Sequence, residues 1–70
     1  MNTIKISASG GFIKLDSLLK LAGSVSTGGQ AKILIQSGEV KVNGEICLTR
    51  GKKMKAGDTA QIFDDIITVI

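Results

Sequence analysis

Hydrophobic positions in the first third of the chain change from a strand period to a helix period. Two isoleucines between Thr3 and Ser7 lie on one face, which is typical of a short strand. The next apolar positions follow the i, i+3, i+4, i+7 spacing of one helix face: Leu15, Leu18, Leu19 and Ala22. Gly23 follows directly and suits the left-handed residue that ends many helices. We therefore expect a first helix over about residues 15–22.

A second helix is predicted to begin at Thr27, after a connector over residues 24–26. Thr27 and Gln30 form a T-x-x-Q capping box, in which the hydroxyl accepts from one free backbone N–H and the glutamine reaches another. Gly38 is the expected end of this helix. Its apolar face comprises Ala31, Leu34 and Ile35.

The dipeptide Asn43-Gly44 stands between two alternating runs and is the clearest local pattern in the sequence. It favours a two-residue hairpin turn, because both central residues must take positive φ. Lys41 then lies on the opposite face from the two valines that flank it. The expected cross-strand partners are Val42 with Glu45 and Val40 with Cys47.

The last part of the chain reads as two more strands. A turn is expected at residues 56–58, followed by strands over 59–63 and 66–70 that Asp64-Asp65 separate. Two tandem helices followed by a run of strands indicate an α+β fold. We expect one domain over residues 1–70, because 70 residues is short even for a single domain.

Composition excludes several kinds of chemistry. The chain has no His, Trp, Tyr or Pro and one Cys, so neither a Cys/His metal site nor a nucleophile–His pair can be assembled. A core this small leaves little room for a water-excluding pocket, so we expect a non-catalytic binding module without cofactor or metal. We interpret Cys47 as a small buried strand residue. With no apolar membrane-spanning run and no signal-peptide pattern, we expect a cytoplasmic protein.

Positive charge is concentrated in the middle of the chain. The net charge is +3, but residues 14–55 carry +5 and residues 56–70 carry −3. A polyanion would therefore be attracted to the middle. The glycines from Gly23 to Gly28 have the Walker A interval, but Gly29 and Gln30 follow where a Lys and a Ser or Thr would be needed, so we exclude nucleotide hydrolysis.

The pair Gly28-Gly29 opens the second helix, although glycine is a poor helix former. Two explanations are open at this point. Another part of the chain could pack closely against the pair, or an anion could approach the free backbone N–H groups of the first turn.

Taken together, the order and spacing of several short motifs resemble the alpha-L RNA-binding motif named after ribosomal protein S-four, and more closely its small stand-alone YaaA/YbcJ-like members. The resemblance covers about residues 12–63. The motifs are Lys14-Leu15-Asp16-xx-Leu19, then Thr27-Gly28-Gly29-Gln30-Ala31-Lys32-xxx-Gln36-xx-Glu39-Val40-Lys41-Val42-Asn43-Gly44, then Arg50-Gly51-Lys52-Lys53-Met54-xx-Gly57-Asp58.

What the resemblance implies is RNA binding without catalysis, in a fold of two helices packed on a small, mostly antiparallel sheet. Gly28 departs from the family pattern, since many members place an Arg there. By position and by the basic surface that we expect, the RNA-binding residues are Lys14, Asp16, Lys20, Thr27, Gly28, Gly29, Gln30, Lys32, Lys41, Asn43, Arg50, Lys52 and Lys53, with Lys55 extending the surface. Asp16 also has a structural explanation, as an acceptor for first-turn N–H groups or a partner of Lys14 or Lys20.

The expected partner is a structured RNA, ribosomal RNA being one candidate, bound by a monomer through phosphate and 2′-OH contacts. Phe12 and Phe63 are the only aromatic residues, so base stacking is not expected to be the main mode. Two alternatives are a helix-turn-helix-like DNA-binding domain and a protein-interaction adaptor that docks through a sheet edge or the Ile-rich C-terminal strand.

Overall fold

The computed structural model describes residues 2–70, which form two helices and seven short strands. In chain order the elements are β1 (Asn2–Ile6), β2 (Ile13–Lys14), α1 (Leu15–Leu21), α2 (Gly28–Gln36), β3 (Lys41–Val42), β4 (Glu45–Ile46), β5 (Lys53–Met54), β6 (Thr59–Ile62) and β7 (Asp65–Val69).

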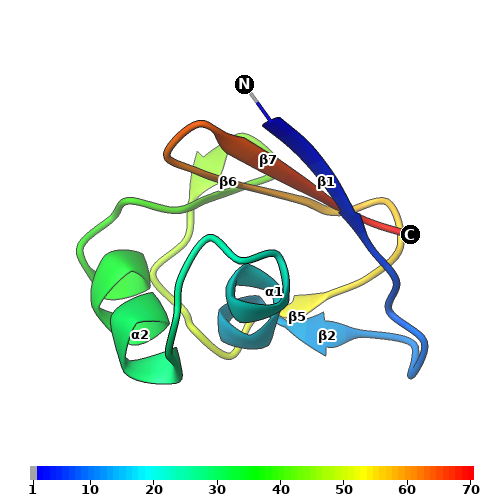
Figure 1. Ribbon diagram of the computed structural model, residues 1–70, viewed down its shortest axis with the longest axis horizontal. Coiled ribbons are helices and arrows are strands. Elements are labelled where there is room, and N and C mark those ends of the chain that lie inside the picture. The colour runs from blue at the N-terminus through cyan, green and yellow to red at the C-terminus, as the bar shows by residue number, and fades with distance from the viewer. Residues whose placement is uncertain (1) are drawn as a thin grey trace.

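Five of the strands form one sheet in the order β1-β7-β6-β3-β4. All neighbouring pairs in it are antiparallel except β1 and β7, which run parallel. The other two strands, β2 and β5, form a separate antiparallel ribbon. Figure 1 shows the five-stranded sheet on one side of the molecule, with α1, α2 and the β2–β5 ribbon on the other. The expected α+β fold, two helices on a mostly antiparallel sheet, is confirmed.

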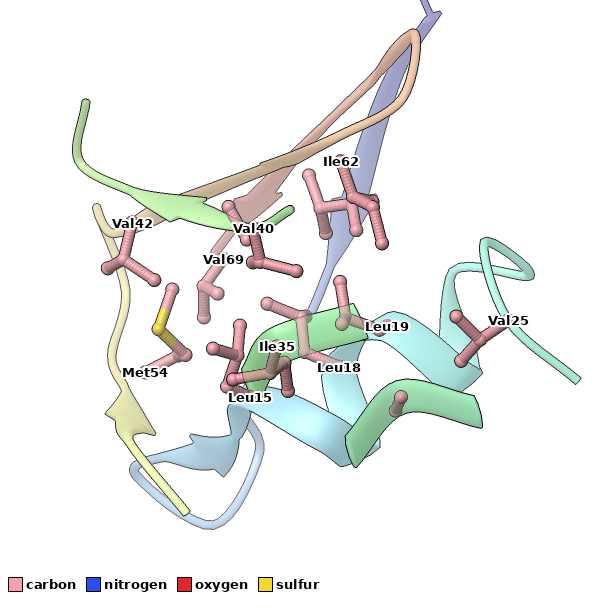
Figure 2. Packing of buried hydrophobic residues seen from close by; sticks show 13 residues of the cluster. Leu15, Leu18, Leu19, Val25, Ile35, Val40, Val42, Met54, Ile62 and Val69 are labelled. Atoms are coloured by element: carbon pink, nitrogen blue, oxygen red, sulfur yellow. The ribbon is translucent and has the colours of Figure 1, made fainter. Parts of the chain in front are cut away.

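The hydrophobic core lies between these two layers (Figure 2). Helix α1 buries the three leucines that its spacing predicted, and α2 buries Ala31 and Ile35. The β2–β5 ribbon contributes Met54, which is completely buried. The loops and the sheet complete the core with Val25, Val40, Val42, Ala60, Ile62, Ile67 and Val69. The ribbon is therefore attached to the same core as the helices.

Most local predictions are confirmed. Both helices begin within one residue and end within two residues of the expected positions, and the glycine that follows each has positive φ. In the hairpin, Asn43 and Gly44 have φ values of 52° and 87°, and Val42 pairs with Glu45 as expected. The backbone N–H of Cys47 donates to the carbonyl of Val40 at 3.0 Å, which continues the same register.

The structure corrects the prediction for the last turn. Phe63 and Asp64 form it, Phe63 having a φ of 53°, whereas Asp65 is the first residue of β7. The Asp65 carboxylate accepts hydrogen bonds from Asn2 Nδ2 at 3.0 Å and from Ser24 Oγ at 2.9 Å. Asp65 thus begins the strand and ties it to β1 and to the connector between the helices. These partners lie 63 and 41 residues away, so no local pattern could reveal them.

Cys47 also differs from the prediction. It lies just after β4 and is only half-buried, and its Sγ lies 3.7 Å from the carbonyl oxygen of Thr49.

Two leucines of α1 provide a matched test of the core. Leu18 is fully buried, whereas Leu21 is 65% exposed on the same helix. We expect Leu18→Ala to lower the free energy of unfolding by about 2–5 kcal/mol, because it removes buried methyl groups and leaves a cavity. Leu21→Ala should change it by less than about 0.5 kcal/mol. Urea unfolding followed by circular dichroism measures both, and equal losses would contradict the packing described.

Candidate nucleic-acid interface

A basic segment that follows the hairpin is held against the start of α1 by backbone hydrogen bonds. The N–H of Leu15 donates to the carbonyl of Lys52 at 2.9 Å, and the N–H of Asp16 donates to that of Arg50 at 3.1 Å. One residue further, β5 pairs with β2. These contacts satisfy N–H groups that a helix start otherwise leaves free. Residues more than thirty positions apart are thereby brought together at one end of α1.

Within this ribbon, two lysines occupy directly opposite positions. Lys14 pairs with Lys53, while the neighbouring pair, Ile13 and Met54, faces the core. Because side chains alternate along a strand, both lysines lie on the outer face of the ribbon. The Lys53 ammonium also lies 5.0 Å from the centroid of the Phe12 ring. We call the surface formed by Phe12, Lys14, Arg50, Lys52 and Lys53 the ribbon face.

The start of α2 has the predicted cap. The backbone N–H of Gln30 donates to Thr27 Oγ1 at 3.1 Å, and Gln30 Oε1 accepts from the N–H of Ser26 at 2.8 Å. Thr27 and Gln30, both predicted to bind RNA, therefore have structural roles at the helix start.

The glycine pair at this helix start is not covered by other residues of the described range 2–70. A Cβ added at Gly28 would meet nothing within 4 Å, and one added at Gly29 would meet only Thr27 Oγ1, at 3.9 Å. Neither glycine has positive φ. Of the two explanations left open by the sequence, close packing within the chain is therefore wrong. Lys32 lies one turn further along the helix and is exposed.

The remaining predicted lysines lie apart from the ribbon face. Lys20 is in the last turn of α1, about 7.5 Å from its start at 1.5 Å per residue, and there its charge interacts favourably with the helix dipole. Lys41 pairs with Gln61, whereas its neighbour Val42 is buried and pairs with the buried Ala60. As predicted, Lys41 lies opposite the valines, which places it on the sheet face away from the helices. The structure does not bring it together with Lys14 and Lys53.

The side chains of Asn43 and Asp16 form hydrogen bonds within the chain. Asn43 Oδ1 accepts from the N–H of Thr59 at 2.9 Å, and its Nδ2 donates to Asp58 Oδ1 at 3.2 Å. Asp16 Oδ1 accepts from the N–H of Ser17 at 2.7 Å, the first of the structural roles expected for it. Asn43 thus joins the hairpin to the turn before β6, a role that the sequence did not indicate.

Asp58 is the acceptor at the centre of that junction. Its Oδ2 accepts from the N–H of Lys55 at 2.9 Å. This backbone hydrogen bond, with the one from Asn43 and the nearby charges of Lys52 and Lys55, holds the pKa of Asp58 below its usual value of 3.8.

An open groove of about 460 Å³ lies beside the ribbon face, between the β3–β4 hairpin and the segment that leads to Lys52. Ile46 and Leu48 line it and are 60% and 59% exposed. The sequence did not indicate this groove. It also did not indicate the position of Lys53 over the Phe12 ring, which depends on the β2–β5 pairing.

A comparison with protein families places the chain in a known group. The model of the S4 domain family matches residues 4–70, nearly the whole chain. The chain belongs to the S4 domain family. The resemblance drawn from the sequence motifs is thereby confirmed.

Relatives within this family are also of similar length. YbcJ of Escherichia coli (strain K12), whose name assigns it provisionally to RNA binding, is 38% identical over 58 residues, which cover 83% of each chain. RlbA of Bacillus subtilis (strain 168), whose name assigns it provisionally to ribosome maturation, is 42% identical over 50 residues, 71% of this chain and 70% of RlbA.

Two features are absent from residues 2–70, the part of the chain that the structure describes. Neither helix is long and apolar enough to cross a membrane. No three Cys, Asp or Glu side chains in this range are grouped so that they could hold a metal ion.

The lowered pKa of Asp58 predicts how stability depends on pH. Because this pKa is lower in the folded chain than in the unfolded chain, the carboxylate stabilises the fold above about pH 4 and loses that effect as the pH falls through the folded value. Asp58→Asn should therefore be less stable than wild type at pH 7, and the difference should shrink at about pH 2–3. Urea unfolding at both pH values measures it. A constant difference would contradict the junction described.

The uncovered glycines predict a stabilising substitution. Alanine has the higher helix propensity and its Cβ meets no obstacle at either position, so Gly28→Ala combined with Gly29→Ala should raise the free energy of unfolding by about 0.5–1 kcal/mol. Thermal unfolding measures the change. A lower melting temperature would show that the pair is needed by the fold itself.

Proposed function

We propose that this chain binds a structured RNA, without catalysis, through the ribbon face and the exposed start of α2. Membership in the S4 domain family and the provisional name of YbcJ support a general role in RNA binding. The provisional name of RlbA supports ribosomal RNA as one candidate within that class. The geometry supports the ribbon face and the start of α2 as the surface that meets the RNA.

The observation that carries the proposal is the pairing of Lys14 with Lys53 across the ribbon. Like charges at directly opposite strand positions repel each other and destabilise a sheet. Arg50 and Lys52, held beside them by the bonds to α1, increase the positive potential. Phosphate groups of RNA relieve this repulsion, because each one neutralises a cation and releases condensed counterions.

Such phosphate contacts select an RNA by its folded shape and not by its base sequence. Phosphate contacts position a protein on nucleic acid but carry no sequence information. The ribbon face and the start of α2 lie at different places on the helical layer. An RNA that contacts both must therefore have phosphates at both places at once. A folded RNA does so with a fixed shape, whereas a flexible strand must lose conformational entropy.

Neutralising the paired lysines tests this surface. We expect Lys14→Gln combined with Lys53→Gln to weaken binding to a labelled RNA hairpin. The slope of log affinity against log salt should also fall, by roughly 1.5, because two phosphate contacts are lost. Fluorescence anisotropy at several salt concentrations measures both quantities.

A matched control removes the same charge from the opposite side of the molecule. Lys5 and Lys41 are both exposed and lie on the sheet face away from the helices. Lys5→Gln combined with Lys41→Gln should change affinity and slope much less. Equal effects of the two double variants would show that the RNA does not distinguish the faces, and the assignment of the ribbon face would be wrong.

The two alternatives are separated by different measurements. A DNA-binding helix-turn-helix would need base-reading side chains at the start of its second helix, where this chain has Gly28 and Gly29. Competition between duplex DNA and structured RNA at equal salt tests that alternative. Exposed Ile46 and Leu48 on the hairpin side of the groove are the feature that favours a protein-interaction adaptor. A partner retained after nuclease treatment and at high salt would support the adaptor.

A further inference from the structure

Phe12 is a large apolar side chain that the core does not use. It is 42% exposed, and it is not among the residues that pack against the buried cluster. It lies between a turn at residues 9–11 and the first residue of β2, which pairs with the buried Met54. The backbone that carries the ring is therefore fixed by the ribbon, while part of the ring is open to solvent.

The surroundings of this ring are cationic. The Lys53 ammonium lies 5.0 Å from the ring centroid, within the range of a cation–π interaction. Lys14 is the cross-strand partner of Lys53 and follows Phe12 by two residues. With Lys53 over one face of the exposed ring, the other face offers a π-surface for a base, and the paired Lys14 and Lys53 offer positive charge for its phosphates.

Phe63, the other aromatic residue, is also exposed but has a different charged environment. It is 59% exposed, but it lies in the β6–β7 turn, followed by two aspartates. Phe63 also lines a hollow with Glu39 and Lys41, so the charges near this ring are mostly negative and disfavour a phosphate. The two phenylalanines therefore form a natural pair for comparison, one on the ribbon face and one on an acidic turn.

We infer that Phe12 is a stacking platform for one unpaired base of the bound RNA, and that Lys14 and Lys53 contact the phosphates on either side of that base. This inference rests on the proposed function and narrows the partner to a structured RNA with an unpaired nucleotide at the ribbon face. With one ring at the interface, stacking adds to a binding mode that phosphate contacts dominate.

Two RNA hairpins that differ in one nucleotide test the inference. The first is a labelled stem with a single bulged adenosine, and the second is the same stem without the bulge. Phe12→Leu should weaken binding of the bulged hairpin about 5-fold or more and leave the continuous hairpin nearly unchanged, because stacking on one base is lost. The salt slope should stay the same, because no charge is removed. Phe63→Leu is the matched control and should affect neither hairpin.

A tryptophan variant keeps the test decisive if Phe12→Leu fails to fold. The chain has no Trp, so Phe12→Trp and Phe63→Trp each introduce a single fluorescent reporter. Saturation with the bulged hairpin should quench the emission of Phe12→Trp strongly and that of Phe63→Trp little. Equal quenching at both positions, or none at Phe12→Trp, would overturn the inference.

The outcomes separate this inference from the proposed function. If the Lys14 and Lys53 double variant loses affinity while Phe12→Leu binds both hairpins as wild type does, the RNA surface stands and the stacking is wrong. If neither variant changes binding, the ribbon face itself is not the RNA-binding surface, and the inference falls with it.

Discussion

The antiparallel pairing of β2 with β5, continued by two backbone hydrogen bonds to the start of α1, is the constraint on which the rest of the structure depends. It joins residues 13–16 to residues 50–54 across more than thirty positions of sequence. Closing a loop of that length costs entropy, which the core must offset. Met54 and Leu15, both completely buried, supply the apolar contacts at this place.

The same pairing determines where the side chains of two lysines lie. Once Ile13 and Met54 face the core, strand alternation leaves Lys14 and Lys53 opposite each other on the outside. A chain selected only for stability would place unlike charges there, since cross-strand ion pairs stabilise a sheet and like charges destabilise it. The cost is small at an exposed site, because solvent and salt screen it. It is nevertheless a local conflict of the kind expected at a functional surface.

Much of the fold could be predicted from the sequence because its signals are local. The leucine spacing of α1, the capping box at Thr27 and the Asn43-Gly44 turn each involve residues within a few positions of one another. The parallel pairing of β1 with β7 and the β2–β5 ribbon were missed, since these short strands carry no pattern that names a partner far along the chain. For the same reason, the sequence could not show which basic residues the fold brings together. Basic residues could be counted from sequence, but Lys41 is separated from Lys14 because it lies on the outer face of the five-stranded sheet, whereas Lys14 lies in the ribbon of the other layer.

The accessible glycines at the start of α2 support the same proposed RNA-binding surface. Sequence left two explanations for Gly28 and Gly29, and the structure removes close packing within the chain. A helix start without side chains remains open to the backbone of a partner. The start of α2 lies in the same layer as the β2–β5 ribbon, which Figure 1 shows beside α1.

The central claim is that one layer of the molecule, the ribbon with α1 and the start of α2, faces the RNA. Titration of ¹⁵N-labelled protein with an RNA hairpin, followed by amide chemical shifts, tests it most directly. The account predicts that the largest shifts fall at residues 12–16, 27–32 and 50–55, with little change in β1 and β7. Largest shifts at β1 and β7 would contradict it.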